Sequence, residues 1–349
     1  MDRVEIIENW LKTQLNQYFT IEPVSSDASF RRYFRITSNN ETYILMDAPP
    51  DLERIDHFLN ITKNLASAEI NAPKIISYDT KLGLILMTDF GNQTYLDVLS
   101  GNKLGMFQQE LYSAAIDSLI NIQTKVIPWG LQDYSDELLI SEMSLFPKWY
   151  LEKFKKFKLQ DQEVLNEIFS EIVMSCKPSN MPGPPMGLVF VHRDYHSRNL
   201  MFIREGNNPG ILDYQDAVVG PCTYDLVSLL KDAYIELDEE FIVEQVARYW
   251  EKVENFDPDY LEWQAPKLDP LEQFERGAPA YFKHFYKDFE MMGVQRHLKI
   301  LGIFSRLSIR DKKNQYLKNI PLVEKYLMNT TEKYEELHPL RRILDKVVS

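Results

Sequence analysis

The sequence predicts an α+β fold with two lobes, a small mixed N-terminal lobe and a larger helical C-terminal lobe. Short runs of strand type alternate with turns up to about residue 90, whereas apolar residues recur at helical spacing from Thr94 onward. Within the helical part, residues 188–216 return to short strands and carry a cluster of acidic and amide side chains. We therefore divide the chain into lobes at residues 1–90 and 91–349.

The N-terminal lobe is predicted to begin with an amphipathic helix over residues 3–19, because its apolar side chains recur at helical spacing. A turn-rich loop at residues 25–29 follows. The alternation in residues 30–36 predicts a strand that places Arg32 among apolar neighbours, where a charge needs a partner. The other predicted elements of this lobe are strand 42–46, helix 52–68, strand 75–78 and strand 82–87.

The C-terminal lobe is predicted to be mainly helical, since its apolar residues follow the helical period over long stretches. A segment rich in proline and glycine, residues 178–187, precedes the short strands. The predicted helices span residues 111–122, 138–154, 164–174, 237–253, 271–289, 294–307 and 317–327, and a further helix starts at residues 223–226.

Composition argues against several classes of protein. The 349 residues carry a net charge of -13, which is unfavourable for non-specific binding to nucleic acid. No stretch reaches the roughly 18 apolar residues that span a bilayer, and the acidic N-terminus is unlike a signal peptide. Cys176 and Cys222 have no metal-ligand spacing and suggest no disulfide framework. We expect a cytoplasmic protein without a membrane, nucleic-acid or obligate protein partner.

The chemistry is predicted to lie where the helical part returns to strands. An apolar strand, residues 188–191, leads into a charged loop that carries Asp194 and ends at Asn199, and a hairpin then returns Asp213 beside that loop. The carboxylate of Asp213 and the amide of Asn199 suit Mg²⁺, which proteins hold by one or two carboxylates together with substrate phosphates. Asp194 is then available to accept a proton from a hydroxyl nucleophile.

The loop contains the string H-R-D-x-x-x-x-N, which is the catalytic-loop pattern of kinases, as His192–Asn199. A charged surface loop between two strands is the alternative, but spacing, residue types and hairpin context favour catalysis. His196 in this loop is more often structural than catalytic. A second kinase-like string, Asp89-Phe90-Gly91, precedes the loop, whereas the metal-binding aspartate must follow it, so the metal role belongs to Asp213.

The strings HRDYHSRN, ILDYQD and GPCTYDLVSLL resemble the aminoglycoside phosphotransferase/choline kinase superfamily. SSDASFRRYFRI, YILMDAPP and MMGVQRHLKILGIFSRL are similar to segments of the anomeric kinases that phosphorylate N-acetylmuramate and N-acetylglucosamine at C1 in cell-wall recycling. The resemblance implies a two-lobed, protein-kinase-like fold and an ATP- and Mg²⁺-dependent transfer to an amino sugar. It assigns catalysis to Asp194 and metal binding to Asn199 and Asp213. Asp225 matches a position that braces the catalytic loop, although a helix N-terminal residue favoured by the dipole is an equal alternative.

The resemblance also implies an ATP site in the N-terminal lobe, where two features depart from the kinase pattern. The loop ending at Ser29 contains no glycine, and strand 43–47 has no lysine to contact the α- and β-phosphates. We predict that Arg32 or Arg31 replaces this lysine and that Ser29 also contacts the nucleotide, with a structural ion pair as the alternative for Arg32. Asp89 lies at the position of the hinge, where backbone groups would meet the adenine.

Four residues are predicted to contact the acceptor. Gln215 and Asp216 follow Asp213, and Gln295 and Arg296 belong to a polar cluster at a helix start, in the region that forms the acceptor pocket of relatives. Exposed turn residues and a solvated helix face are the respective alternatives. A pocket wall formed by the polar cluster with Gln295 and Arg296 suits amide, hydroxyl or carboxylate groups of an acceptor better than cations such as choline or an aminoglycoside. A kinase for one of those alcohols and a catalytically silent nucleotide-binding protein are the alternative functions.

Overall fold

The computed structural model describes residues 2–15, 18–26, 30–100, 105–159, 161–176, 188–254 and 278–348. The chain forms two compact units, Met1–Tyr95 with Asn199–Gln215, and Leu96–Arg198 with Asp216–Ser349. The predicted division at residue 90 placed the segment Asn199–Gln215 in the second lobe, whereas its contacts group it with the first unit. No helix in the described part of the chain is long and apolar enough to cross a membrane.

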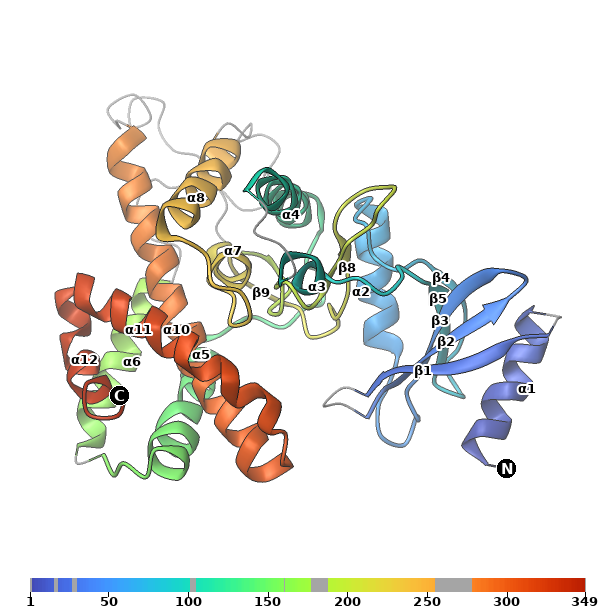
Figure 1. Ribbon diagram of the computed structural model, residues 1–349, viewed down its shortest axis with the longest axis horizontal. Coiled ribbons are helices and arrows are strands. Elements are labelled where there is room, and N and C mark those ends of the chain that lie inside the picture. The colour runs from blue at the N-terminus through green and yellow to red at the C-terminus, as the bar shows by residue number, and fades with distance from the viewer. Residues whose placement is uncertain are drawn as a thin grey trace. The chain divides into compact units, whose positions relative to one another are not determined.

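The first unit is built on an antiparallel sheet with the strand order β1-β2-β3-β5-β4 (Figure 1). The strands are β1 (Thr20–Ser26), β2 (Arg32–Ser38), β3 (Glu41–Asp47), β4 (Ile75–Asp79) and β5 (Leu84–Thr88). Helix α1, Arg3–Leu15, shares one core cluster with the sheet, in which Trp10 and Leu11 join Leu45. Full burial of such a side chain stabilises the fold by about 1.5–3 kcal/mol.

Strand β1 was not predicted, and the predicted opening helix is too long, because α1 ends at Leu15. The strand lies at the edge of the sheet, and its register with β2 shifts between Pro23 and Ser25. Edge strands and bulges are the positions where a sheet tolerates proline. Because β1 lacks the apolar alternation of a half-buried strand, its existence depends on pairing with β2. Residues Ser25 and Ser26, predicted as loop, therefore belong to a strand.

The hairpin predicted after the charged loop is present as β7 (Leu200–Met201) and β8 (Gly210–Ile211). The segment that follows packs on helix α2, Asp56–Ser67. The Tyr214 ring stacks on Phe58 with ring centroids 5.2 Å apart, and its hydroxyl lies 2.9 Å from the Thr62 hydroxyl. These contacts explain why the hairpin belongs to the first unit.

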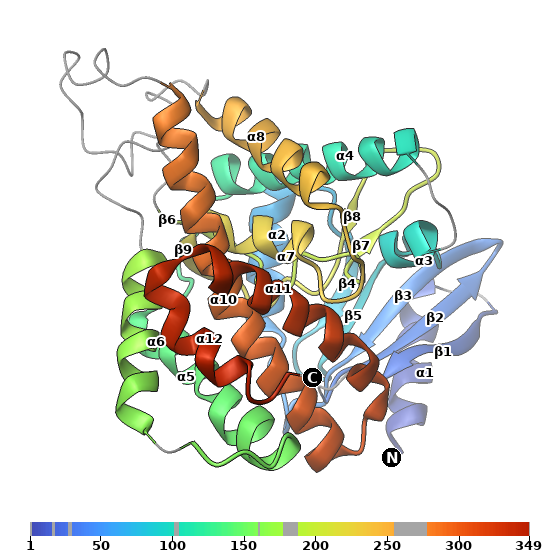
Figure 2. The same ribbon diagram turned by 60° about the vertical axis from the view of Figure 1, so that its left-hand side comes forward.

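The second unit is mainly helical, as predicted, and its longest helix, α10, spans Ala278–Asp311 (Figure 2). A strand pair, β6 (Leu188–Val191) and β9 (Val218–Pro221), flanks the charged loop and the hairpin in sequence. The remaining helices are α3 (Tyr95–Ser100), α4 (Gly105–Lys125), α5 (Asp136–Met143), the π-helix η1 (Phe146–Phe154), α6 (Gln162–Cys176), α7 (Thr223–Leu230), α8 (Glu239–Glu254), the 3₁₀-helices η3 (Asn314–Asn319) and η4 (Glu335–Leu337), α11 (Ile320–Lys333) and α12 (His338–Leu344).

Helix α10 replaces two predicted helices, 271–289 and 294–307, of which residues 271–277 lie outside the described residues. The helix continues through Gly293, although glycine destabilises a helix interior by about 1 kcal/mol. Its neighbours are buried, and α10 packs against η1, α11, α7 and α6. Tertiary packing therefore outweighs the local preference. The predicted helix 138–154 is likewise wrong as one element, because α5 and η1 are separate.

Candidate functional site

The charged loop follows β6 in the second unit and is braced from α7. Asp225 is fully buried and accepts hydrogen bonds from the backbone N–H groups of His192 at 2.6 Å and Arg193 at 3.0 Å. Burial raises the pKa of Asp225 to about 6, although His192 and the N–H donors act in the opposite direction. The first two residues of the H-R-D string are thus held by one side chain.

Asp194 presents a carboxylate that is 45% exposed and lies beside a buried cation. Arg296 Nη2 is 3.7 Å from Asp194 Oδ1, and His196 Nε2 is 3.9 Å from the same oxygen. Partial burial would raise the pKa of Asp194, but Arg296, together with His196 and Lys299, lowers it below its ordinary value. The carboxylate is therefore ionised at neutral pH, which is the state that accepts a proton.

An ionic network lies beside the loop. Glu142 receives Lys299 Nζ at 2.9 Å and also pairs with the Arg193 guanidinium. The Tyr224 hydroxyl accepts hydrogen bonds from Lys299 at 3.0 Å and from Arg296 at 3.1 Å. Burial would raise the pKa of Glu142, but Lys299 and Arg193 hold it below its ordinary value. The network therefore keeps its charges in the protein interior by pairing them.

Gln295 and Arg296 occupy the middle of α10, not a helix start, which corrects that prediction. They are 0% and 4% exposed, so the alternative of a solvated helix face is wrong. Gln295 Nε2 lies 3.4 Å from the Leu139 carbonyl oxygen. Of the other two predicted acceptor contacts, Gln215 is buried and Asp216 is exposed. A role for these four residues in binding an acceptor stays a prediction.

Asn199 and Asp213 come together in the first unit at one end of the hairpin. The Leu212 N–H donates to the Asn199 carbonyl at 3.0 Å, and Asn199 Nδ2 lies 3.4 Å from Asp213 Oδ2. Gln215 Nε2 donates to Asp213 Oδ1 at 2.8 Å. The described residues contain no group of three or more His, Cys, Asp or Glu side chains that could hold a metal. The pair nevertheless fits Mg²⁺, which takes few protein ligands when phosphates and water complete its shell.

The two arginines predicted to contact phosphate both pair with carboxylates of the first unit. Arg32 Nε donates to Asp47 Oδ2 at 2.9 Å across β2 and β3, and the Arg32 side chain stays 45% exposed. Arg31 pairs with Glu53, and its side chain is 11% exposed. The charge on the apolar face of β2 thus has the partner that it requires. Ser29 lies outside the described residues.

Asp89 is held by another arginine of β2, Arg35. Its carboxylate accepts hydrogen bonds from Arg35 Nε at 2.6 Å and Nη2 at 3.0 Å, and from the Gly91 N–H at 2.9 Å. The Asp89 side chain is 3% exposed. This bidentate ion pair gives Asp89, in the Asp89-Phe90-Gly91 string that follows β5, a structural role.

Sequence reasoning missed Glu142 and Tyr224. The polar residues 295, 296 and 299 on one helix were a signal that a network existed, because buried charges require partners. Nothing in the sequence around Glu142 indicates that it is the partner, since it lies 157 positions before Lys299.

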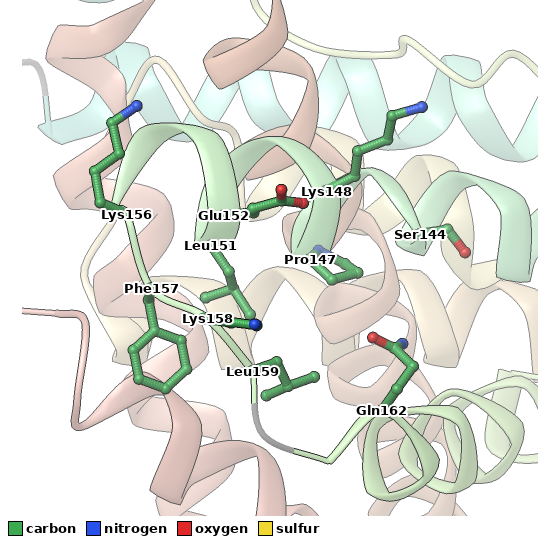
Figure 3. Close-up of a pocket in the computed structure, with 10 residues that line it drawn as sticks. All are labelled: Ser144, Pro147, Lys148, Leu151, Glu152, Lys156, Phe157, Lys158, Leu159 and Gln162. Atoms are coloured by element: carbon green, nitrogen blue, oxygen red, sulfur yellow. The ribbon is translucent and has the colours of Figure 1, made fainter.

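A cavity of about 700 Å³ opens elsewhere in the second unit (Figure 3). Its lining comes from η1 and the segments next to it, and includes Lys148, Lys156, Lys158 and Glu152. The described lining residues include none of the predicted site residues. This cavity is therefore separate from the loop that carries Asp194.

Comparison with known proteins identifies full-length relatives. An N-acetylmuramate/N-acetylglucosamine kinase of Neisseria meningitidis serogroup B is 37% identical over 350 residues, covering 100% of this chain and 97% of that protein. A protein of the same name from Pseudomonas aeruginosa is 36% identical, covering 98% of this chain and 96% of its own length. The predicted similarity to N-acetylmuramate/N-acetylglucosamine kinases is confirmed.

Solved structures at low identity share the fold. A choline kinase from Streptococcus pneumoniae matches with a TM-score of 0.60 at 12% identity, over 94% of this chain and 100% of that chain. A spectinomycin phosphotransferase in complex with ADP and spectinomycin matches with a TM-score of 0.56 at 12% identity, over 92% and 93%. These matches confirm the predicted kinase-like fold. The sequence model of the phosphotransferase enzyme family matches residues 20–265, and the chain belongs to that family.

Proposed function

We propose that this chain is an ATP-dependent kinase that phosphorylates the anomeric hydroxyl of N-acetylmuramate and N-acetylglucosamine. The observation that carries the proposal is the full-length similarity to kinases named for these two sugars. The ionised carboxylate of Asp194 supports the chemistry, because hydroxyl phosphorylation needs a proton acceptor. Since ATP is supplied in the cytoplasm, we propose that the reaction takes place there.

Asp194 accepts the proton of the anomeric hydroxyl while the hydroxyl oxygen forms a bond to the γ-phosphorus of ATP. The bond between the γ-phosphorus and the bridging oxygen of ADP breaks. The products are the sugar 1-phosphate, ADP and the proton, which Asp194 then releases to water. An anomeric hydroxyl is more acidic than an ordinary alcohol, so its proton is easier for a carboxylate base to accept.

Asn199 and Asp213 are the residues that hold Mg²⁺ in this proposal. When bound, the ion neutralises charge on the phosphate oxygens. Gln215 holds one oxygen of the Asp213 carboxylate by its hydrogen bond, which orients the other oxygen. Gln215 therefore orients the proposed metal ligand Asp213 and is not itself a ligand in this proposal.

Arg32 is our first choice for the contact with the nucleotide phosphates and Arg31 our second. The Arg32 side chain is the more exposed, so it can donate to a phosphate while it retains Asp47. Ser29 and the hinge at Asp89 complete the proposed nucleotide contacts. On the acceptor side, Asp216 is the exposed candidate for a sugar hydroxyl.

Phosphorus NMR of the products tests the proposal. The protein, ATP and Mg²⁺ are incubated in turn with N-acetylmuramate, N-acetylglucosamine and choline. We expect a sugar 1-phosphate with each of the two sugars and no product with choline. Phosphocholine, or phosphate on the sugar 6-position, would overturn the assignment of the acceptor.

A further inference from the structure

Arg193, the residue before Asp194, has a strained backbone that is held from three directions. Its φ of +74° lies in the left-handed region, which costs a non-glycine residue roughly 1–3 kcal/mol and persists only where the surroundings impose it. Its N–H donates to Asp225 at 3.0 Å, its carbonyl accepts from Arg296 Nη1 at 2.7 Å, and its side chain pairs with Glu142. Because this backbone sets the direction of the next side chain, the same contacts orient Asp194.

Arg296 connects this clamp to the carboxylate itself. Its Nη1 donates to the Arg193 carbonyl and to the Tyr224 hydroxyl, while its Nη2 lies 3.7 Å from Asp194 Oδ1. A guanidinium can serve these partners together because its donors point in fixed, divergent directions. A lysine at this position would supply the charge without this fork.

The other charges of the network leave Asp194 as the counter-ion of Arg296. Glu142 pairs with Arg193 and Lys299, whereas Asp194 is the only carboxylate within ion-pair distance of Arg296 among the described residues. Arg296 is 4% exposed, and a buried charge that loses its partner is strongly destabilising. The ion pair therefore restrains the Asp194 carboxylate on the side of α10.

We propose that Arg296 is a positioning residue of the phosphotransferase, which aims the Asp194 carboxylate through the Arg193 carbonyl and an ion pair. The inference rests on the proposed role of Asp194 as proton acceptor. It assigns Arg296 a task other than the predicted contact with the acceptor sugar. A positioning residue affects turnover of either sugar equally, whereas a contact with the lactyl carboxylate would raise the KM of N-acetylmuramate alone.

The experiment measures kcat and KM with both sugars in the full-length protein and three variants. We expect Arg296→Met to lower kcat about 10²-fold with both sugars, the effect of a slight misplacement of a reacting group. The KM values for ATP and for both sugars should stay within about threefold of wild type. Arg296→Lys should recover part of kcat because it keeps the charge. Arg306→Met, in the same helix but outside the network, should retain wild-type kcat.

Circular dichroism and ADP-binding calorimetry establish that each variant is folded. If Arg296→Met does not fold, Arg296→Lys and Tyr224→Phe carry the test, and each should lower kcat without raising the KM of either sugar. Wild-type kcat in both would overturn the proposal, as would a rise in KM confined to N-acetylmuramate. If the wild-type protein phosphorylates a different acceptor, the proposed function fails, and the same comparison of kcat with KM on that acceptor still tests Arg296.

Discussion

Ion pairs support both the charged loop that carries Asp194, in the second unit, and strand β2 of the first unit, but in different surroundings. Beside the loop, Glu142 and Lys299 have side chains that are each 9% exposed, whereas Arg32 on β2 is 45% exposed. Breaking a buried pair typically destabilises a protein by about 3–5 kcal/mol, while exposed pairs contribute about 0–1 kcal/mol. Pairing in the interior therefore enforces the loop geometry, whereas the half-exposed Arg32 can donate to a phosphate while it retains the buried Asp47.

The largest effect is expected at Asp194, in the charged loop. Asp194→Asn removes the proton acceptor but keeps its size, so turnover should fall by about 10²–10⁴-fold. ADP binding, measured by calorimetry, should stay at its wild-type value because the nucleotide contacts are proposed elsewhere. Equal turnover in variant and wild type would show that Asp194 is not the proton acceptor.

Removal of the Glu142 carboxylate tests whether the ionic network contributes to stability as buried ion pairs do. Glu142→Met leaves Arg193 and Lys299 without their carboxylate, and we expect the free energy of unfolding in urea to fall by about 3–5 kcal/mol. Glu236→Met is the matched control, since Glu236 and Lys325 are both more than half exposed, and it should cost less than about 1 kcal/mol. Similar losses in the two variants would contradict the comparison.

The hairpin provides a test that separates metal binding from the loop. Asp213→Ala should weaken Mg²⁺-dependent ADP binding by more than the roughly 10–100-fold that loss of a supporting residue costs. Binding without Mg²⁺ should change little. Asp216→Ala, three residues on and exposed, should leave ADP binding as in wild type. Calorimetry with and without Mg²⁺ distinguishes these outcomes, and a metal-independent loss in Asp213→Ala would count against a metal ligand.

Arg32, the first residue of β2, and Arg31, directly before it, are expected to show smaller effects. Arg32→Ala should raise the KM for ATP roughly ten- to a hundredfold, the consequence of losing a charge-assisted contact worth about 1.5–3 kcal/mol. Arg31→Ala should have a smaller effect, since Arg31 is nearly buried against Glu53. Steady-state kinetics with varied ATP measures both. If neither substitution changes KM or turnover, another group replaces the missing lysine.

The smallest effect is expected at Asp225, which holds the backbone of the charged loop, and it should appear as a dependence of turnover on pH. The pKa of Asp225 is raised to about 6, so protonation below that pH weakens its hold on the backbone of the loop, and turnover should fall. As the pH falls, Asp225 takes up a proton at a higher pH in the folded state than in the unfolded state. The contribution of Asp225 to the free energy of unfolding is therefore present at low pH and is lost as the pH rises through about 6. As the pH rises through about 6, turnover should therefore increase while this contribution to stability decreases. Asp225→Asn should remove the acid limb from the pH profile of kcat.

Features of the fold that depend only on residues near one another in the chain could be predicted from the sequence. The loop His192–Asn199, the hairpin that returns Asp213 and the change from strands to helices near residue 90 are local patterns, and the structure contains the elements they predict. Even the departure from the kinase pattern, in the loop at residues 25–29 and in strand 43–47, could be read directly, because it consists of residues that are missing from short strings.

Which polar residues are buried, and which partners they bind, depends on contacts between segments that are distant in the sequence. Tertiary structure made β1 a strand, joined two predicted helices into α10 and buried Arg296 beside Asp194. The periodicity of apolar residues indicates which side of a helix or strand faces the core. The burial of a charge depends instead on a counter-charge that comes from a distant segment. Glu142, which pairs with Lys299, shows this most clearly, because no local rule connects positions so far apart in the chain.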